Sequence, residues 1–192
     1  MSSIVIKGNT SGQVEIAAPD VAGSTTLTMP TTDGTVITNN SAVSDLPKGP
    51  AFSAYLSADQ SFSTSTNTKL QFNTEDFDTS SDYDNTTNYR YTPSVAGYYQ
   101  VNTSARLNYS GAASDNVQLH IWKNGTSHTY TQYNNATGIY GSLNVSALIY
   151  MNGSTDYLEV YAYSQHGSPF VDVKIGSFNS TARFNAALVR GA

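Results

Sequence analysis

The chain has 192 residues, with 9 Lys+Arg against 14 Asp+Glu, which gives a formal net charge of −5, and charged residues make up 12% of the composition. The absence of cysteine excludes disulfides, thiolate metal sites and cysteine nucleophiles, and the acidic balance disfavours a protein that neutralises nucleic-acid phosphates. No apolar run reaches the ~18 residues of a membrane span, so neither a nucleic acid nor a membrane is predicted as a partner.

The first part of the chain lacks aromatic residues. Residues 1–50 contain no Phe, Tyr or Trp, whereas residues 51–192 hold all 14 Tyr, all 7 Phe and the single Trp122. Because aromatic side chains supply the largest burials in a core, residues 1–45 are predicted to form an extended arm of short strands without a core of its own. Residues 46–50 are then a linker, and residues 51–192 a folded head. The apolar residues predicted to anchor the arm alternate with polar ones between turn formers: Ile4, Ile6, Val14, Ile16, Leu27, Met29 and Val36.

Beyond residue 50, alternation of apolar and polar residues with period two dominates, which is typical of half-buried strands. Residues 99–107 show it most clearly, and residues 117–121 repeat it before Asn124-Gly125, a strong hairpin signal. Further strands are predicted at 51–56, 69–72, 89–91, 143–150, 157–163 and 184–189. The sequence therefore predicts an all-β head, a jelly-roll sandwich of about eight to ten strands.

A spaced series of landmarks runs through the head: Phe72, Asp78, Tyr83, Tyr91, Gly97, Tyr99, Val101 and, in the last strand, Phe184 and Leu188. This series resembles the globular head of complement component one-q (C1q), a relative of tumour necrosis factor (TNF). The spacing from Tyr83 to Tyr91 is one residue longer than in that family, and Tyr91 and Val101 replace phenylalanines. The resemblance covers residues 50–192 and implies a jelly roll that assembles as a compact homotrimer.

Three of these landmarks have a physical role at the start of a strand. Gly97 is predicted to permit a backbone turn that a side chain would block, and Tyr99 and Val101 share one face of the strand that follows. Seven tyrosines are too many to fit in the core of one subunit. Some of them are predicted to line a threefold axis or a binding surface, and the alternative is that they are exposed singly over the surface. These are Tyr98, Tyr109, Tyr130, Tyr133, Tyr140, Tyr161 and Tyr163.

Residues 12–38 carry a second resemblance. Their short blocks 14–19 and 24–30, followed by Asp33-Gly34, are similar to segments of tailed-bacteriophage structural proteins that precede trimeric heads or fibre domains. The first residues also lack the basic flank and long apolar core of a signal peptide. The resemblance implies a virion component that is assembled in the host cytoplasm.

Residues for catalysis are sparse. His120, His128 and His166 are far apart and belong to no metal-binding or triad motif, so no catalytic residue, cofactor site or metal site is predicted, and the protein is not expected to be an enzyme. The acidic residues 75–78, continued by Asp82 and Asp84, offer oxygen atoms that suit calcium. Their spacing is not that of an EF-hand, and a solvated acidic loop is the preferred interpretation.

Two functions remain open. The first is a trimeric capsid decoration (cement) protein that clamps capsid subunits through its N-terminal arm, with sister subunits and the major capsid protein as partners. The alternative is a short tail fibre or receptor-binding tip, attached to tail proteins, that contacts host glycans or proteins. Its candidate contact residues are Tyr130, Tyr133, Tyr140 and the loop 165–167.

Overall fold

A computed structural model describes residues 3–7, 10–11, 13–17, 49–62, 65–109, 116–134, 140–165, 171–173 and 182–192. The chain divides into two compact units, Met1–Pro47 and Lys48–Ala192. Within the described ranges, no helix has the length and apolar character to cross a membrane.

The first unit contains a two-stranded antiparallel ribbon. β1 (Ser3–Lys7) pairs with β2 (Gln13–Ala17), and the register sets Ile4 opposite Ile16 and Ile6 opposite Val14. Because alternate residues of a strand fall on the same side, these four apolar positions share one side of the ribbon. Leu27, Met29 and Val36, also predicted to anchor the arm, lie outside the described residues.

The second unit, the head, is a sandwich of two antiparallel sheets. The front sheet contains β3 (Ala51–Tyr55), β4 (Gln60–Phe62), β6 (Thr74–Asp78), β9 (Ala96–Tyr109), β12 (Tyr140–Asn152), β14 (Val171–Val173) and β15 (Arg183–Gly191). The back sheet contains β5 (Thr68–Lys69), β7 (Tyr83–Asp84), β8 (Arg90–Tyr91), β10 (Asn116–Lys123), β11 (Thr126–Asn134) and β13 (Leu158–Gln165). The predicted all-β jelly-roll sandwich is confirmed. Its described strands outnumber the prediction because several of them are only two or three residues long.

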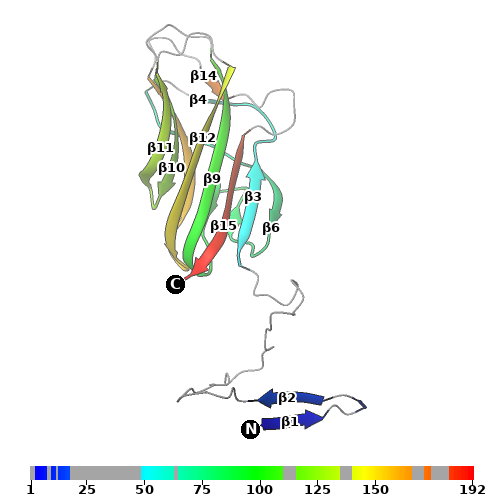
Figure 1. Ribbon diagram of the computed structural model, residues 1–192. Coiled ribbons are helices and arrows are strands. Elements are labelled where there is room, and N and C mark those ends of the chain that lie inside the picture. The colour runs from blue at the N-terminus through cyan, green and yellow to red at the C-terminus, as the bar shows by residue number, and fades with distance from the viewer. Residues whose placement is uncertain are drawn as a thin grey trace. The chain divides into compact units, whose positions relative to one another are not determined.

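In the front sheet, β12, β9, β15, β3 and β6 lie side by side in that order (Figure 1). The 14-residue β9 pairs with β12 along one edge and with β15, then β14, along the other. In the back sheet the order is β11, β10, β13, β8, β7. β10 and β11 join through Asn124 (φ 52°) and Gly125 (φ 76°), the two left-handed residues of a type I′ turn, as the Asn-Gly signal predicts.

An aromatic cluster fills the space between the sheets. Phe52 from β3 stacks on Tyr83 and Tyr91, with ring centroids 4.7 and 4.3 Å apart, and its ring meets Phe184 at 4.9 Å in an edge-on geometry. Tyr99 contacts Tyr91 at 5.9 Å. The cluster joins strands of both sheets, so these rings hold the two layers of the sandwich together.

Gly97 corrects one expectation. It lies inside β9, paired with Gly191 of β15, and forms no turn. A Cβ atom at Gly97 would lie 2.4 Å from the carbonyl oxygen of Arg190 and 2.6 Å from a methyl group of Leu188. Glycine is required here because two strands approach closely, and not because the backbone needs positive φ.

Replacing Gly97 by alanine is therefore expected to lower the free energy of unfolding by about 1–3 kcal/mol, the usual cost of overpacking. Gly191, directly opposite, is the matched control, because a Cβ atom there meets nothing within 4 Å. Gly191→Ala should change stability by less than about 0.5 kcal/mol. Urea denaturation of the two variants measures the difference, and equal midpoints would contradict the close-approach explanation.

Candidate functional site

The outward face of the front sheet (hereafter the front face) carries apolar side chains at one end. Tyr98 on β9 packs against Tyr150 on β12, with ring centroids 5.5 Å apart, and the two residues are partners in the register. Leu148, two residues earlier on β12, is 58% exposed, and Val189, at the bulge of β15, is 62% exposed. We call these four residues the apolar end. Large apolar side chains gathered on one exposed surface indicate an interaction site.

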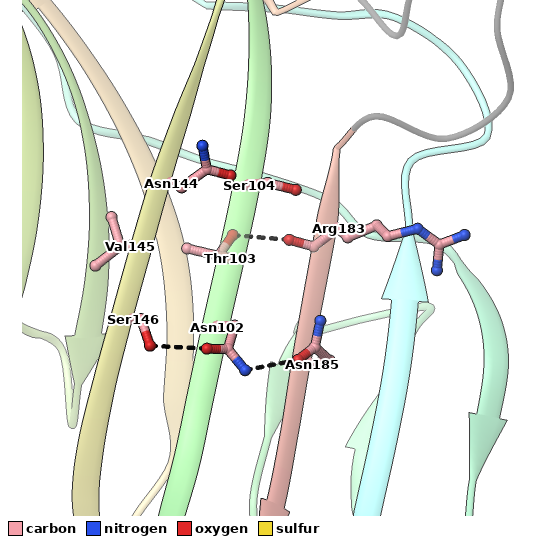
Figure 2. Close-up of a pocket in the computed structure, with 8 residues that line it drawn as sticks. All are labelled: Asn102, Thr103, Ser104, Asn144, Val145, Ser146, Arg183 and Asn185. Carbon is pink, nitrogen blue, oxygen red and sulfur yellow. Dashed lines mark hydrogen bonds between the residues drawn. The ribbon is translucent and has the colours of Figure 1, made fainter.

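The middle of the front face is a ladder of uncharged polar side chains across three strands. The Ser146 hydroxyl donates to Asn102 Oδ1 at 2.8 Å, and Asn102 Nδ2 donates to Asn185 Oδ1 at 3.1 Å. Figure 2 shows Asn102 between the other two side chains. The ladder borders a shallow hollow of about 310 Å³, which is lined by Asn102, Thr103, Ser104, Asn144, Val145, Ser146, Arg183 and Asn185.

The far side of the front face, over β3 and β6, carries an ion pair. Arg183 donates to Asp76 Oδ2, and the Ser53 hydroxyl donates to the same oxygen at 2.9 Å. Burial acts to raise the pKa of Asp76, but the hydrogen bonds from Ser53 and Arg183 outweigh it and hold that pKa below 3.8. A second hollow, of about 300 Å³, lies beside the half-exposed Phe77. The opposite charges of Arg183 and Asp76 cancel, which lowers the cost of covering this side with another protein.

The predicted solvated acidic loop at 75–78 is wrong. These residues form β6, the edge strand of the front sheet, which pairs with β3 in an antiparallel register with one bulge. Backbone pairing with β3 overrides the low strand propensity of Asp and Glu. Among the described residues, no group of three His, Asp or Glu side chains is placed to hold a metal ion.

Apart from the partly exposed Asp78 of β6, the landmarks of the C1q-like series lie in the interior of the head. Phe72, Tyr83, Tyr91, Tyr99, Val101 and Phe184 are buried, Gly97 is buried at the strand contact, and Leu188 is half-buried against the core. Contacts with another subunit must therefore use other side chains. The sequence analysis named only Tyr98 from the front face among the candidate tyrosines; it missed Leu148, Tyr150, Val189 and the polar ladder.

Of the other predicted contact tyrosines, those whose side chains are described lie on the back sheet. Tyr130 and Tyr133 on β11 are about half exposed, and Tyr161 and Tyr163 on β13 are partly buried. The side chains of Tyr109 and Tyr140 and residues 166–167 of the predicted contact loop lie outside the described residues. The front face and β11 are thus separate surfaces, because they belong to different sheets.

His120 on β10 is enclosed by its neighbours. Its ring stacks on Tyr130 at 4.8 Å, Nδ1 lies 2.9 Å from the Ser127 hydroxyl, and Nε2 lies 2.8 Å from Gln118 Oε1. Gln118 Oε1 can only accept, so Nε2 carries the proton and Nδ1 accepts from Ser127 in the neutral ring. Burial lowers the pKa of His120 below 6.5.

Stability is therefore expected to fall as the pH drops below 6.5, because the unfolded chain then binds a proton that the folded His120 resists. The loss is at most about 1.4 kcal/mol per pH unit and ends once the folded pKa is passed. Urea denaturation between pH 7.5 and 5 measures it. The variant His120→Gln should lose this part of the pH dependence. Asp76 does not contribute between pH 7.5 and 5, because its pKa lies below 3.8. Equal pH dependence in the variant would contradict the assignment.

Comparison with solved structures agrees with this architecture. The globular domain of zebrafish complement 1qA protein matches 76% of this chain and 100% of its own length, with a TM-score of 0.56 and 17% identity. Murine APRIL matches 74% of this chain and 100% of its own length, with a TM-score of 0.53 and 8% identity. No protein-family model and no curated protein matches the sequence.

The class that the sheets and their order define is an antiparallel jelly-roll sandwich. More specifically, the head has the C1q/TNF-like jelly-roll fold, and the resemblance of the spaced landmarks to that fold is confirmed. At these identities the likeness concerns the fold alone.

Proposed function

We propose that this protein is a trimeric structural component of a tailed-bacteriophage virion, a capsid decoration protein whose arm attaches the head to capsid subunits. The role is structural and involves no catalysis. Assembly takes place in the host cytoplasm, and the partners are two further copies of the chain and the major capsid protein.

The composition of the front face supports the proposed trimer. Its apolar end, uncharged ladder and mutually paired Arg183 and Asp76 fit a protein interface, whose core is depleted in charge and enriched in apolar and aromatic groups. The exposed Arg190, opposite Tyr98 in the register, would then lie at the rim, which is usually polar. Tyr98 and Tyr150 supply large amphipathic rings, which are frequent at such interfaces. Burial of this face against sister subunits would remove the exposed patch from water, which is the main favourable term in association.

The ribbon of β1 and β2 supports the anchoring part. An isolated two-stranded ribbon is marginally stable in water, and Ile6 on its apolar side is 57% exposed. A ribbon of this kind gains stability when its apolar side is covered, and its open edges can add to a sheet of the partner. The phage-like segment 12–38 points to a virion protein as that partner.

Two neighbouring residues of the ribbon test the anchor. Ile6 and Val5 are both about half exposed but fall on opposite sides of the ribbon, since they are adjacent in β1. Ile6→Lys is expected to weaken co-sedimentation with capsids lacking the protein at least about tenfold, which corresponds to about 1.4 kcal/mol. Val5→Lys is expected to bind as the wild type does.

Deletion of residues 1–45 extends this test. The truncated head should remain folded and trimeric yet fail to bind capsids, and capsids without the protein should lose resistance to heat. Equal loss of binding in Ile6→Lys and Val5→Lys would contradict an anchor with one apolar side. Full capsid binding by the truncated head would overturn the proposed role of the arm.

A receptor-binding tip on the tail is the second candidate. It is supported by Tyr130, which is 53% exposed on the outward side of the edge strand of the back sheet. In that case particles lacking the protein would fail to adsorb to host cells while their capsids stay as heat-resistant as before. Electron microscopy of the labelled protein on particles separates the two locations directly.

A further inference from the structure

The outward side of the back sheet carries a row of aromatic rings. Tyr130 on β11 stacks on His120 of β10, with ring centroids 4.8 Å apart and an interplanar angle of 22°. Trp122 of β10 stacks on Tyr161 of β13 at 4.1 Å and 25°. The register places His120 opposite both Tyr130 and Tyr161. We call these four residues and the adjoining Gln118 and Gln132 the aromatic face.

The rings follow one another across three adjacent strands. Neighbouring strands of a sheet lie ~4.8 Å apart, so the row from Tyr130 to Tyr161 spans about 10 Å, comparable to a disaccharide. Tyr130 is 53% exposed, and Trp122 and Tyr161 are partly exposed. Rigid rings in a row give an extended surface with little conformational entropy to lose on binding.

Amide side chains lie two register positions away from the stacked Tyr130 and His120, on the same side of the sheet. Gln118 and Gln132 are opposite each other on β10 and β11. Gln118 Nε2 and Asn116 Nδ2 both donate to the single oxygen Gln132 Oε1, each at 3.4 Å. These bonds are longer than the usual 2.7–3.2 Å range for N–H···O. An amide carries two N–H donors and one acceptor oxygen. Since Gln118 Oε1 already bonds His120 Nε2, the amide N–H groups are what the row offers a ligand.

The charges at this surface cancel. Lys69 Nζ lies 2.5 Å from Glu159 Oε1, and the Tyr161 hydroxyl donates to Glu159 Oε2 at 3.3 Å. A purely apolar partner would bury the amides without bonds, which is costly, and an ionic ligand would find no uncompensated charge in this pair. The remaining match is a neutral ligand with both C–H faces and many hydroxyl groups.

We propose that the aromatic face binds a neutral oligosaccharide. Tyr130 and Trp122 each have one ring face stacked on His120 or Tyr161. Their other faces and edges take the C–H faces of the sugar units, and Gln118 and Gln132 bond the hydroxyls. The site lies on the back sheet of the head and not on the front face, so it goes beyond capsid attachment and does not depend on it.

Trp122 is the single tryptophan of the chain and reports on this site by its fluorescence. The full-length protein is titrated with maltohexaose, cellohexaose and the hexamer of N-acetylglucosamine as neutral probes, and with a heparin hexasaccharide as a charged probe. At least one neutral probe is expected to give a saturable change in Trp122 emission, and isothermal titration calorimetry should return the same dissociation constant.

Two tyrosines of one strand give the matched test. Tyr130 and Tyr133 are about equally exposed, but Tyr133 pairs with the inward-facing Val117 and so lies on the other side of β11. Tyr130→Ala is expected to raise the dissociation constant at least about tenfold, equivalent to about 1.4 kcal/mol, with unchanged circular dichroism. Tyr133→Ala should bind as the wild type does.

Three outcomes would overturn the proposal: no saturable response to any neutral probe, tighter binding of the heparin probe than of all neutral ones, or equal losses in the two variants. Co-sedimentation of the same variants with capsids distinguishes failure of the oligosaccharide proposal from failure of the proposed capsid attachment, since Tyr130→Ala should still bind capsids.

Discussion

Replacing Phe52 by alanine is expected to lower the free energy of unfolding by about 3–5 kcal/mol, the range for removal of a buried aromatic ring. Phe52 is fully buried and contacts Tyr83, Tyr91 and Phe184 at centroid distances of 4.3 to 4.9 Å. The change leaves a cavity between the sheets and removes three ring contacts at once. Because native domains are stable by about 5–15 kcal/mol, this loss is a large part of the total.

Urea denaturation followed by circular dichroism measures this effect. Tyr133→Ala is the control, because its ring is half exposed and surface changes usually stay within about 0.5 kcal/mol. Phe52→Leu, which refills part of the cavity, should fall between the two. Equal midpoints for Phe52→Ala and Tyr133→Ala would contradict the central role of the aromatic cluster.

The second large effect concerns assembly. If the front face is buried in a trimer, Leu148→Arg places an unpaired guanidinium in each of the subunit contacts, and an uncompensated buried charge costs several kcal/mol. The dissociation constant should rise at least about a hundredfold, equivalent to about 2.7 kcal/mol. Size-exclusion chromatography with light scattering at micromolar concentration should then show a trimer for the wild type and a monomer for the variant.

Tyr133→Arg controls for a new charge on a comparably exposed position outside the front face, and it should leave the trimer intact. A monomeric wild type would contradict the proposed assembly itself. A trimeric Leu148→Arg variant would instead show that another surface holds the subunits together.

Strands with one buried side are predicted well from the sequence. Residues 99–105 alternate, and in the structure Tyr99, Val101, Thr103 and Ala105 are buried while Gln100, Asn102 and Ser104 lie on the front face. The Asn124-Gly125 turn is predicted equally well, because its positive φ values suit few other residue pairs. Local pattern suffices where burial on one side decides the structure.

Among the described strands of five or more residues, two were not predicted, for a shared reason. β6 is acidic and β11 consists mainly of Thr, Ser, His, Gln and Tyr, and both lie at sheet edges. An edge strand is held by backbone bonds to one neighbour and has little apolar surface to bury, so its sequence carries no alternation. Such a strand can be recognised only once its partner strand is known, and for β6 that partner, β3, is distant in sequence.

One feature of the sequence indicates the front face as an interaction surface, and the sequence analysis did not use it. In β12 alternation gives way at residues 147–151 to five consecutive apolar residues, which is typical of strands covered on both sides. The inward-facing Ile149 and Met151 are buried, whereas Leu148 and Tyr150 are exposed in the single chain. The polar ladder could not be predicted, because its members meet only once the register of three strands is fixed.

The position of β3 has a consequence for how the protein is made. β3 pairs with β15, and Ser53 accepts a hydrogen bond from Arg183, 130 residues further along the chain. At a synthesis rate of about 5–20 residues per second, roughly 6 to 26 s pass between the appearance of the two strands. During that interval Phe52 has no Phe184 to pack against, so nascent heads that crowd on neighbouring ribosomes are at risk of exchanging this strand.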